Sequence, residues 1–305
     1  MTENFSPQRW ANTLTLLLNS VHGAAAERFP VRVPDLAKEY SHHRFPDDPV
    51  SLVLGDSLPG FDGALYKAPP GKKGWGIIYN SRVASPGRVN FTVAHEFGHY
   101  LLHRLQFPRG IECAPRDMMR WDSEYRQMEA QANDFAASLL MPLDDFRRQI
   151  DARAKPTLDD LGGCAQRYGV SLVAATLRWL QYTERRAVMV VSRDGFIMWA
   201  RSSPAALRTR AYFKTAGRPA IAVPASSLAA QPELLEKSRG QMVHDGDVWF
   251  AESCEEIALA SDQYDFTISL LHLEPMIRLS RFDEAADEED SFDVMTRRMG
   301  THLSR

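Results

Sequence analysis

The sequence contains few cysteines and no strong excess of charge. Its three cysteines, Cys113, Cys164 and Cys254, lie far apart in a chain of 305 residues and form no Cys-x-x-Cys pair. Scattered cysteines in odd number argue against a disulfide framework and favour a reduced, cytoplasmic protein. The formal net charge of −3 gives no basic bias overall, so a chain that mainly binds nucleic acid is not expected.

Long hydrophobic runs and a secretory leader are also missing. The longest apolar runs, such as residues 139–141, are far shorter than the roughly 20 residues that cross a bilayer. The N-terminal residues MTENFSPQRW lack the basic and then apolar segments of a signal peptide. We therefore expect no membrane association and a cytoplasmic location.

The pattern of predicted helices and strands changes along the sequence, and the chain is longer than one typical domain. Residues 1–148 read as an α+β unit and residues 149–186 as a helical segment. Residues 187–282 read as an α/β domain, and residues 283–305 as an acidic tail that we expect to be mobile. The predicted fold class is therefore α+β, with separate domains.

The first unit should combine helices with a short sheet. Ser85 suits the N-cap and Pro86 the first position of a long helix. A second long helix should stop at Met141-Pro142, because proline cannot continue a helix. The predicted helices are about 7–21, 34–41, 86–105 and 123–140, and the predicted strands are 63–66 and 75–79.

The first long helix carries the pattern His-Glu-x-x-His at residues 95–99, which read HEFGH. With 3.6 residues per turn, His95 and His99 lie on one face, where two imidazoles can bind one zinc ion. Glu96 lies about 100° around the helix, which suits a general base that acts on water. His103 lies one turn beyond His99 and is a candidate catalytic donor.

The remaining positions of this helix divide into two faces. The polar side also holds Arg88 and Thr92, and the predicted buried side holds Val93, Phe97, Leu101 and Leu105. A chance match on an amphipathic helix is the simplest alternative. Two histidines and a carboxylate also bind iron in non-haem oxygenases, but those sites need no glutamate like Glu96, so hydrolysis is favoured.

A zinc hydrolase needs a third protein ligand, and the second long helix offers Glu129. This carboxylate lies at the edge of an apolar face and therefore requires a partner. Asn133, one turn later, can orient a ligand, and Ala132 and Ala136 are small enough for close helix packing. Gln131 and Asp134 should point outward. Two alternatives stay open. Glu129 could pair with Arg88 or Arg126, and Asp122 or Glu124 could be the third ligand instead.

Together these segments resemble the ImmA/IrrE family of metallopeptidases. The matching residues are Arg88, FTVAHEFGHYLLH over residues 91–103, and E-x-x-A-N-x-F-A-x-x-L-L-M-P over residues 129–142. The resemblance is strong over residues 60–142 and weaker beyond residue 182. It implies a zincin-like domain with zinc ligands His95, His99 and Glu129 and with Glu96 catalytic.

The resemblance also implies a cofactor, a target and further domains. The cofactor is one Zn²⁺ per chain, with another divalent ion such as Mn²⁺ as the alternative. The target is a helix-turn-helix repressor, whose cleavage switches on stress-response or mobile-element genes. Some members of the family add a helix-turn-helix-like segment and a GAF-like sensor domain, and the three-part texture of this chain is similar.

The segment 157–182 should form two helices around a turn at residues 168–171. Its second helix begins SLVAAT, which offers almost no side chain that reads bases or holds phosphates. Direct DNA binding is therefore not expected, and a packing or docking role is favoured.

Several details of the catalytic unit stay open. An oxyanion requires a donor, for which His103, Tyr79, Tyr100 and Arg88 are candidates. The strand 75–79 is either an edge that pairs with extended substrate or an ordinary sheet strand.

The C-terminal domain should open with a β-hairpin around Arg193-Asp194-Gly195 and contain strands at 247–251 and 266–273. Its aromatic residues indicate a core, with an aromatic-lined pocket as the alternative. His244, Asp245, Asp247 and His272 match no metal-binding pattern, so 245–247 is interpreted as a turn.

The leading hypothesis is a metallo-endopeptidase that acts on a repressor. The alternatives are a DNA-binding or transcription-regulatory protein with a structural metal site, and a broad-specificity cytosolic peptidase. The sequence leaves the scissile bond, the activating signal and the oligomeric state open.

Overall fold

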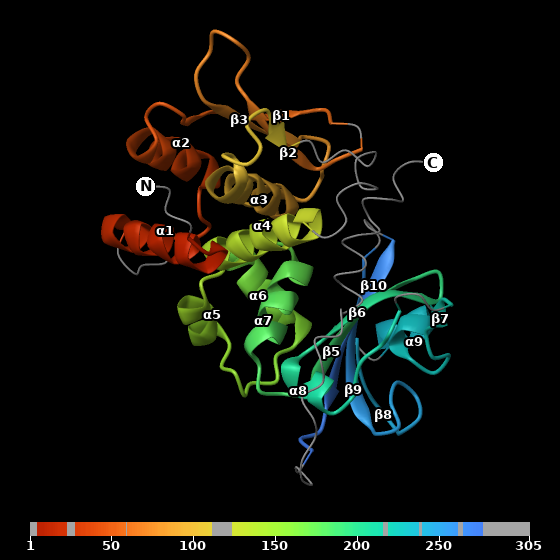
Figure 1. The fold of residues 1–305 in the computed structure, drawn as a ribbon. Helices are drawn as coiled ribbons and strands as arrows, with labels where there is room; N and C mark the ends of the chain where they lie inside the picture. Colours follow the sequence, from red (N-terminus) through yellow and green to blue (C-terminus); the bar gives the residue numbers. More distant parts are fainter. Residues whose placement is uncertain are drawn as a thin grey trace. The chain divides into compact units, whose positions relative to one another are not determined.

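The computed structural model describes residues 5–22, 28–58, 60–111, 124–215, 219–237, 240–261 and 265–276 (Figure 1). These residues form two compact units. The first contains the described residues of 1–146 and 164–174, and the second contains those of 147–163 and from 175 onward. The predicted acidic tail, residues 283–305, lies outside the described residues.

The first unit combines helices with a four-stranded sheet, as the sequence predicts for an α+β fold. The helices that begin in it are α1 (Pro7–His22), α2 (Val33–Arg44), α3 (Pro86–His103), α4 (Glu124–Leu140), α5 (Leu143–Gln149) and α7 (Leu172–Tyr182). Ser85 caps α3 by accepting a hydrogen bond from the backbone N–H of Arg88, which confirms the predicted start. Leu105 lies beyond the end of α3 and is 63% exposed, so its predicted place in the core is wrong.

The sheet of this unit has four strands in the order β1-β3-β2-β4. These are β1 (Val50–Asp56), β2 (Gly63–Lys67), β3 (Trp75–Asn80) and β4 (Gly110–Ile111). β1 and β3 run parallel, and the other pairs are antiparallel. The segment 75–79 is therefore an interior strand, so its interpretation as an edge that receives substrate is wrong. The unpredicted β1 occupies that edge instead.

The core of the first unit lies between the sheet and α3. Trp75, Ile77 and Leu65 are buried on the sheet, and the ring of Trp75 meets that of Tyr100 from α3 at 6.4 Å between centroids. The Tyr100 hydroxyl donates to the backbone carbonyl of Asp48 at 2.7 Å, and burial raises its pKa above the usual value. Tyr100 is therefore a packing residue, which contradicts its place among the oxyanion donors.

Close packing of α3 on α4 brings the two motif-bearing helices together (Figure 1). A Cβ atom at Gly98 would lie 2.9 Å from the ring of Phe135 and 3.3 Å from the Cα of Ala132. Glycine at 98 and alanine at 132 therefore permit the approach, as the small residues of the second helix predict.

The turn at residues 168–171 joins α6 (Leu158–Tyr168) to α7 (Leu172–Tyr182), which confirms the predicted helical pair. Asp145 accepts a hydrogen bond from the Tyr168 hydroxyl at 2.7 Å and two from the Arg167 guanidinium at 3.0 and 3.1 Å. The amide of Asn90 on α3 donates to the carbonyl of Gly169 at 3.1 Å. These bonds fix the turn within the first unit.

The second unit is built on a six-stranded antiparallel sheet of order β7-β6-β5-β10-β9-β8. Its strands are β5 (Ala187–Arg193), β6 (Phe196–Ser202), β7 (Ile221–Ala222), β8 (Gln241–His244), β9 (Cys254–Ser261) and β10 (Phe266–Leu273). Short helices, α8 (Pro204–Arg208), η2 (Leu228–Ala230) and α9 (Pro232–Lys237), lie between β6 and β8 in the chain. The predicted β5–β6 hairpin and β10 are confirmed.

The predicted strand at 247–251 is wrong, because this segment is a turn between β8 and β9. Asp247 has a φ of 73°, and its N–H donates to the carbonyl of Phe250 at 2.7 Å. The predicted turn at 245–247 is thereby confirmed. The rings of Trp249, Phe250 and Phe213 pack together, with centroids 5.1 to 5.9 Å apart, so these aromatic residues serve the core as expected.

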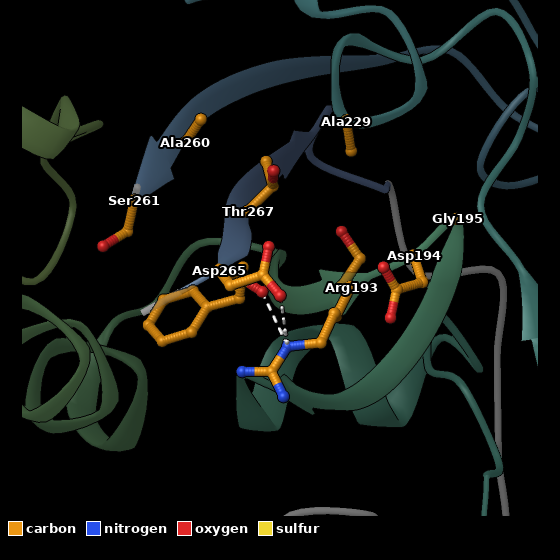
Figure 2. A pocket seen from close by; sticks show the side chains of 10 residues that line it. Arg193, Asp194, Gly195, Ala229, Ala260, Ser261, Asp265 and Thr267 are labelled. Carbon is orange, nitrogen blue, oxygen red and sulfur yellow. Dashed lines mark hydrogen bonds and ion pairs between the residues drawn. The ribbon is translucent and has the colours of Figure 1, made fainter. Parts of the chain in front are cut away.

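A polar pocket of about 160 Å³ lies at the ends of β5, β9 and β10, where Arg193 donates to the carbonyl of Asp265 at 2.6 Å (Figure 2). None of the helices in the described part of the chain combines the length and hydrophobicity that crossing a membrane requires.

Candidate metal centre

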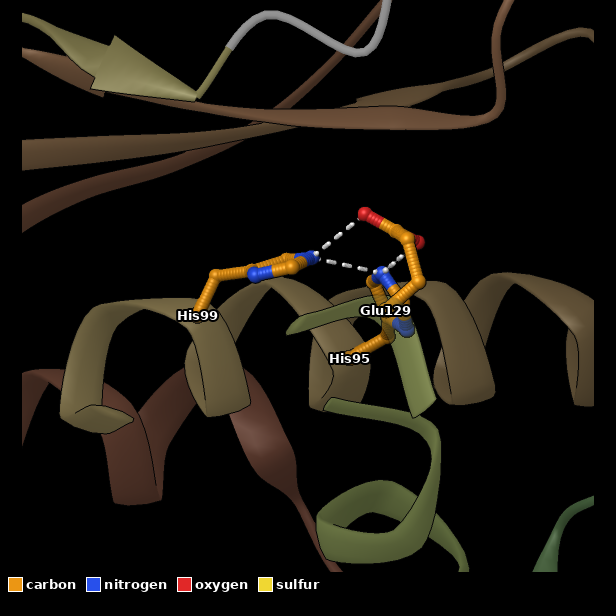
Figure 3. A group of neighbouring side chains, drawn as sticks. All are labelled: His95, His99 and Glu129. Carbon is orange, nitrogen blue, oxygen red and sulfur yellow. Dashed lines mark hydrogen bonds and ion pairs between the residues drawn. The ribbon is translucent and has the colours of Figure 1, made fainter. Parts of the chain in front are cut away.

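Three side chains from two helices converge in the first unit (Figure 3). His95 and His99 extend from α3, and their Nε2 atoms lie 2.9 Å apart. Glu129 extends from α4, with one oxygen 3.2 Å from the Nε2 of His95 and the other 3.2 Å from the Nε2 of His99. Helical periodicity therefore brings the two imidazoles together, and the α3–α4 contact supplies the acid.

The spacing of these donors fits a small tetrahedral ion. Zinc bonds nitrogen and oxygen ligands at about 2.0–2.1 Å, so neighbouring ligands of a tetrahedral site lie about 3.3 Å apart. The separations of 2.9 and 3.2 Å agree with that value to within a few tenths of an ångström. Two imidazoles with one carboxylate are also a donor set that zinc accepts.

Asn133 holds the first imidazole. Its Oδ1 lies 2.9 Å from the Nδ1 of His95, and an amide oxygen can only accept a hydrogen bond. The Nδ1 of His95 therefore carries a hydrogen, and in the neutral ring the lone pair lies on Nε2, which faces the other two donors. This contact is the one that the sequence predicts for Asn133.

The second imidazole has a different partner. The Nδ1 of His99 lies 3.0 Å from the Nδ1 of His103, and the Nε2 of His103 lies 2.9 Å from the Oε1 of Gln131. Both ring nitrogens of His103 are thus engaged, and the residue is only 3% exposed.

Glu96 lies beside the cluster in an unusual environment. It is 2% exposed, and its Oε2 has no hydrogen-bond partner among the described residues. Burial, opposed by the charge of His95, raises its pKa to about 7. A carboxyl with such a pKa can take up and release a proton near neutrality.

The backbone of β2 covers Glu96. A Cβ atom at Gly63 would lie 2.5 Å from the Cγ2 of Thr92 and 3.0 Å from the Oε1 of Glu96. Only glycine therefore lets this strand lie so close to the carboxylate.

The charges within the cluster are strongly coupled. Although burial lowers the pKa of His95, the charge of Glu129 raises it to about 9. Burial and the charge of His95 lower the pKa of His99 to about 4. Despite its burial, Glu129 keeps a pKa well below its usual value because of the two histidines. A cation bound here must displace a proton from His95, so its affinity should fall in acid.

The comparison with protein families agrees with this arrangement. Residues 26–180, about half of the chain, match the family model of the IrrE N-terminal-like domain, Peptidase_M78. The chain belongs to this family. It is therefore a metallopeptidase, and its substrate is a protein. No curated protein matches the chain.

The other residues of this IrrE-like peptidase that the sequence offers as oxyanion donors or alternative ligands have different surroundings. The Nε of Arg88 donates to Asp62 at 2.9 Å, so its guanidinium forms an ion pair at the surface. The ring of Tyr79 lies over Gly55, where an added Cβ would be 2.9 Å from it. Asp122, an alternative ligand, lies outside the described residues, and Glu124 is the first residue of α4.

Sequence reasoning missed two features of this centre. Gln131 does not point outward as predicted, because α4 turns that position toward His103 on α3. The role of Gly63 cannot be predicted from the sequence around it, because the approach of β2 to Glu96 depends on tertiary packing. A polar residue two positions after Glu129, beside the predicted apolar face, was the available hint for Gln131.

Proposed function

We propose that the chain is a zinc-dependent endopeptidase in which His95, His99 and Glu129 hold one zinc ion and Glu96 is the general base. The observation that carries this proposal is the convergence of two Nε2 atoms and a carboxylate beside the Oε2 of Glu96, which has no hydrogen-bond partner in the described part of the chain. Mn²⁺ is the alternative ion.

A bound zinc ion would lower the pKa of water and polarise the scissile carbonyl. The Oε2 of Glu96 takes the proton from the attacking water and passes it to the leaving amine. The position of Glu96, buried beside the donor cluster, suits both steps, because the same carboxyl must accept and then release the proton. Asn133 holds the ring of His95, and the missing side chain at Gly63 leaves space for the carboxylate.

The proposed substrate is a helix-turn-helix repressor, whose cleavage would activate stress-response or mobile-element genes. The support is the family relationship. The apolar start of α7 favours docking over DNA binding for this part of the chain.

The domain division remains part of the proposal. It comprises a zincin-like domain at 1–148, a helix-turn-helix-like segment at 149–186, a GAF-like sensor at 187–282 and a tail at 283–305. Helices α6 and α7 around one turn and the antiparallel sheet of the second unit support the middle two. The free, buried thiol of Cys254 supports a cytoplasmic location.

The decisive experiment compares Glu96→Gln with wild type. Bound zinc is measured by mass spectrometry of the native protein, and cleavage is followed by intact mass of the helix-turn-helix protein encoded nearest to it. We expect cleavage to fall at least about 100-fold with zinc content unchanged. Glu39→Gln, the same change on the exposed face of α2, is the control and should cleave normally.

Two outcomes would overturn the proposal. Undiminished cleavage by Glu96→Gln would remove the general base. Zinc binding without cleavage of any protein by the wild type would instead favour a regulatory protein with a structural metal. Casein digested in parallel separates a broad-specificity peptidase from a repressor-specific one.

A further inference from the structure

A continuous chain of hydrogen bonds links α4 to the second histidine of the centre. It runs from the Oε1 of Gln131 to the Nε2 of His103 at 2.9 Å, and from the Nδ1 of His103 to the Nδ1 of His99 at 3.0 Å. The rings of His99 and His103 lie 5.1 Å apart between centroids, and both are buried. Burial keeps water from replacing either partner.

The amide of Gln131, at the start of this series of hydrogen bonds, determines which ring nitrogen of each histidine carries a hydrogen. An amide oxygen has no hydrogen to give, so the Nε2 of His103 must donate to Gln131. The Nδ1 of a neutral His103 is then an acceptor, and the hydrogen between the two rings belongs to the Nδ1 of His99. As a result, the Nε2 of His99 holds a lone pair directed at His95 and Glu129.

The opposite arrangement would disable the centre. If His103 donated from Nδ1, the Nδ1 of His99 would be the acceptor and its Nε2 would carry a hydrogen. A protonated Nε2 cannot bind a metal. The identity of the group at 131 therefore affects a ligand atom two hydrogen bonds away.

We propose that His103 and Gln131 are positioning residues that fix His99 in the tautomer with a free Nε2. The inference rests on the proposed role of His99 as a metal ligand and not on cleavage. It gives α4 three tasks at this centre. Glu129 completes the donor set, Asn133 orients His95 directly, and Gln131 orients His99 through His103.

This role differs from catalysis by His103. With Nδ1 bound to His99 and Nε2 bound to Gln131, His103 has no ring hydrogen left for an oxyanion or a leaving group. Its loss should therefore change zinc affinity first, and cleavage only as a result.

The tautomers can be measured in the metal-free protein by long-range ¹H–¹⁵N NMR of the histidine rings. We expect His99 to carry its hydrogen on Nδ1 and His103 on Nε2. Zinc affinity is measured in parallel by competition with a chelator. We expect Gln131→Leu to weaken zinc binding about 10–100-fold.

Matched variants separate positioning from general damage to the helix. Gln127→Leu makes the same change one turn earlier, at an exposed position of α4, and should leave zinc affinity unchanged. Gln131→Glu keeps an oxygen acceptor for His103 and should retain both tautomers and wild-type affinity. His103→Phe should weaken binding as Gln131→Leu does.

Two results would overturn the inference. These are a hydrogen on the Nε2 of His99 in the metal-free wild type, and equal zinc affinities for Gln131→Leu and Gln127→Leu. If the wild type binds no zinc, the proposed function fails, while the NMR result still decides the tautomers. If His103→Phe does not fold, Gln131→Leu and the wild-type spectrum suffice.

Discussion

Each of the two units buries a glutamate beside a histidine, but the two carboxylates have opposite surroundings. Glu256 in the second unit is 0% exposed, and Glu96 in the first is 2% exposed. Glu256 accepts five hydrogen bonds, whereas the Oε2 of Glu96 has no partner among the described residues. The donors to Glu256 are the Nε2 of His244, the indole of Trp249, the hydroxyl of Ser269 and the backbone N–H groups of Leu228 and Ala229.

The difference separates a structural acid from a reactive one. A buried carboxylate is costly unless hydrogen bonds replace its water. Glu256 meets that condition and attaches the η2 segment to the sheet. Glu96 does not meet it at Oε2, and such an atom beside a donor cluster is typical of a group reserved for chemistry.

The largest expected effect comes from making the same substitution at both positions. Glu256→Gln replaces an acceptor with an amide N–H₂ that faces other donors, including His244 at 2.7 Å. We expect it to lower the free energy of unfolding of the second unit by about 3–5 kcal/mol. Glu96→Gln should leave stability nearly unchanged while cleavage is lost. Urea unfolding of both variants checks this, and equal destabilisation would break the comparison.

His272 extends the comparison to pH. Burial lowers its pKa from 6.5 to about 4, so between these values the unfolded chain binds more protons than the folded one. Stability of the second unit should therefore fall as the pH drops from 6.5 to 4, by up to about 3 kcal/mol. Urea midpoints across this range measure the slope. The same slope in His272→Phe would show that another group is responsible.

Gly63→Ala tests the covering of Glu96 by β2. The new Cβ would lie 2.5 Å from Thr92 and 3.0 Å from Glu96, so the strand must shift at a cost of about 1–3 kcal/mol. Cleavage should fall as well, because the carboxylate is displaced. Gly76→Ala on the neighbouring strand is the control, since its nearest heavy atom would be 3.8 Å away. Similar losses of stability and cleavage in both variants would contradict the proposed covering of Glu96 by β2.

The smallest expected effect is an increase in stability. Gly162 lies in α6, and a Cβ there would meet no heavy atom of the described residues within 4 Å. Gly162→Ala should raise the free energy of unfolding by about 0.5–1 kcal/mol, because alanine loses less backbone entropy in a helix. Thermal unfolding measures the change, and a loss of stability would show an unrecognised contact.

Local periodicity explains why the two long helices and the His-His-Glu group could be predicted. His95 and His99 are one turn apart on any helix, and Glu129 lies on a helix whose small residues predict close packing. The contact of Gln131 with His103 and the place of Gly63 depend on how α4 and β2 approach α3. No pattern within a single segment contains that information.

The strands show the same limit. β9 was not predicted, because Glu255 and Glu256 interrupt its apolar pattern, and the partners of Glu256 come from distant segments. The run 247–251 has the composition of a strand, but the positive φ of Asp247 turns it. Tertiary hydrogen bonds to Glu256 override the local pattern in β9, whereas a local hydrogen bond from Asp247 to Phe250 closes the turn at 247–251.

The central claim is that His95, His99 and Glu129 bind one divalent ion together. Its most direct test is the zinc content and X-ray absorption spectrum of the purified wild type, compared with Glu129→Ala. The account predicts one zinc per wild-type chain, bound only by nitrogen and oxygen and including two imidazoles, and a large loss of zinc in the variant. A wild type without stoichiometric zinc, a sulfur ligand, or equal zinc content in Glu129→Ala would contradict it.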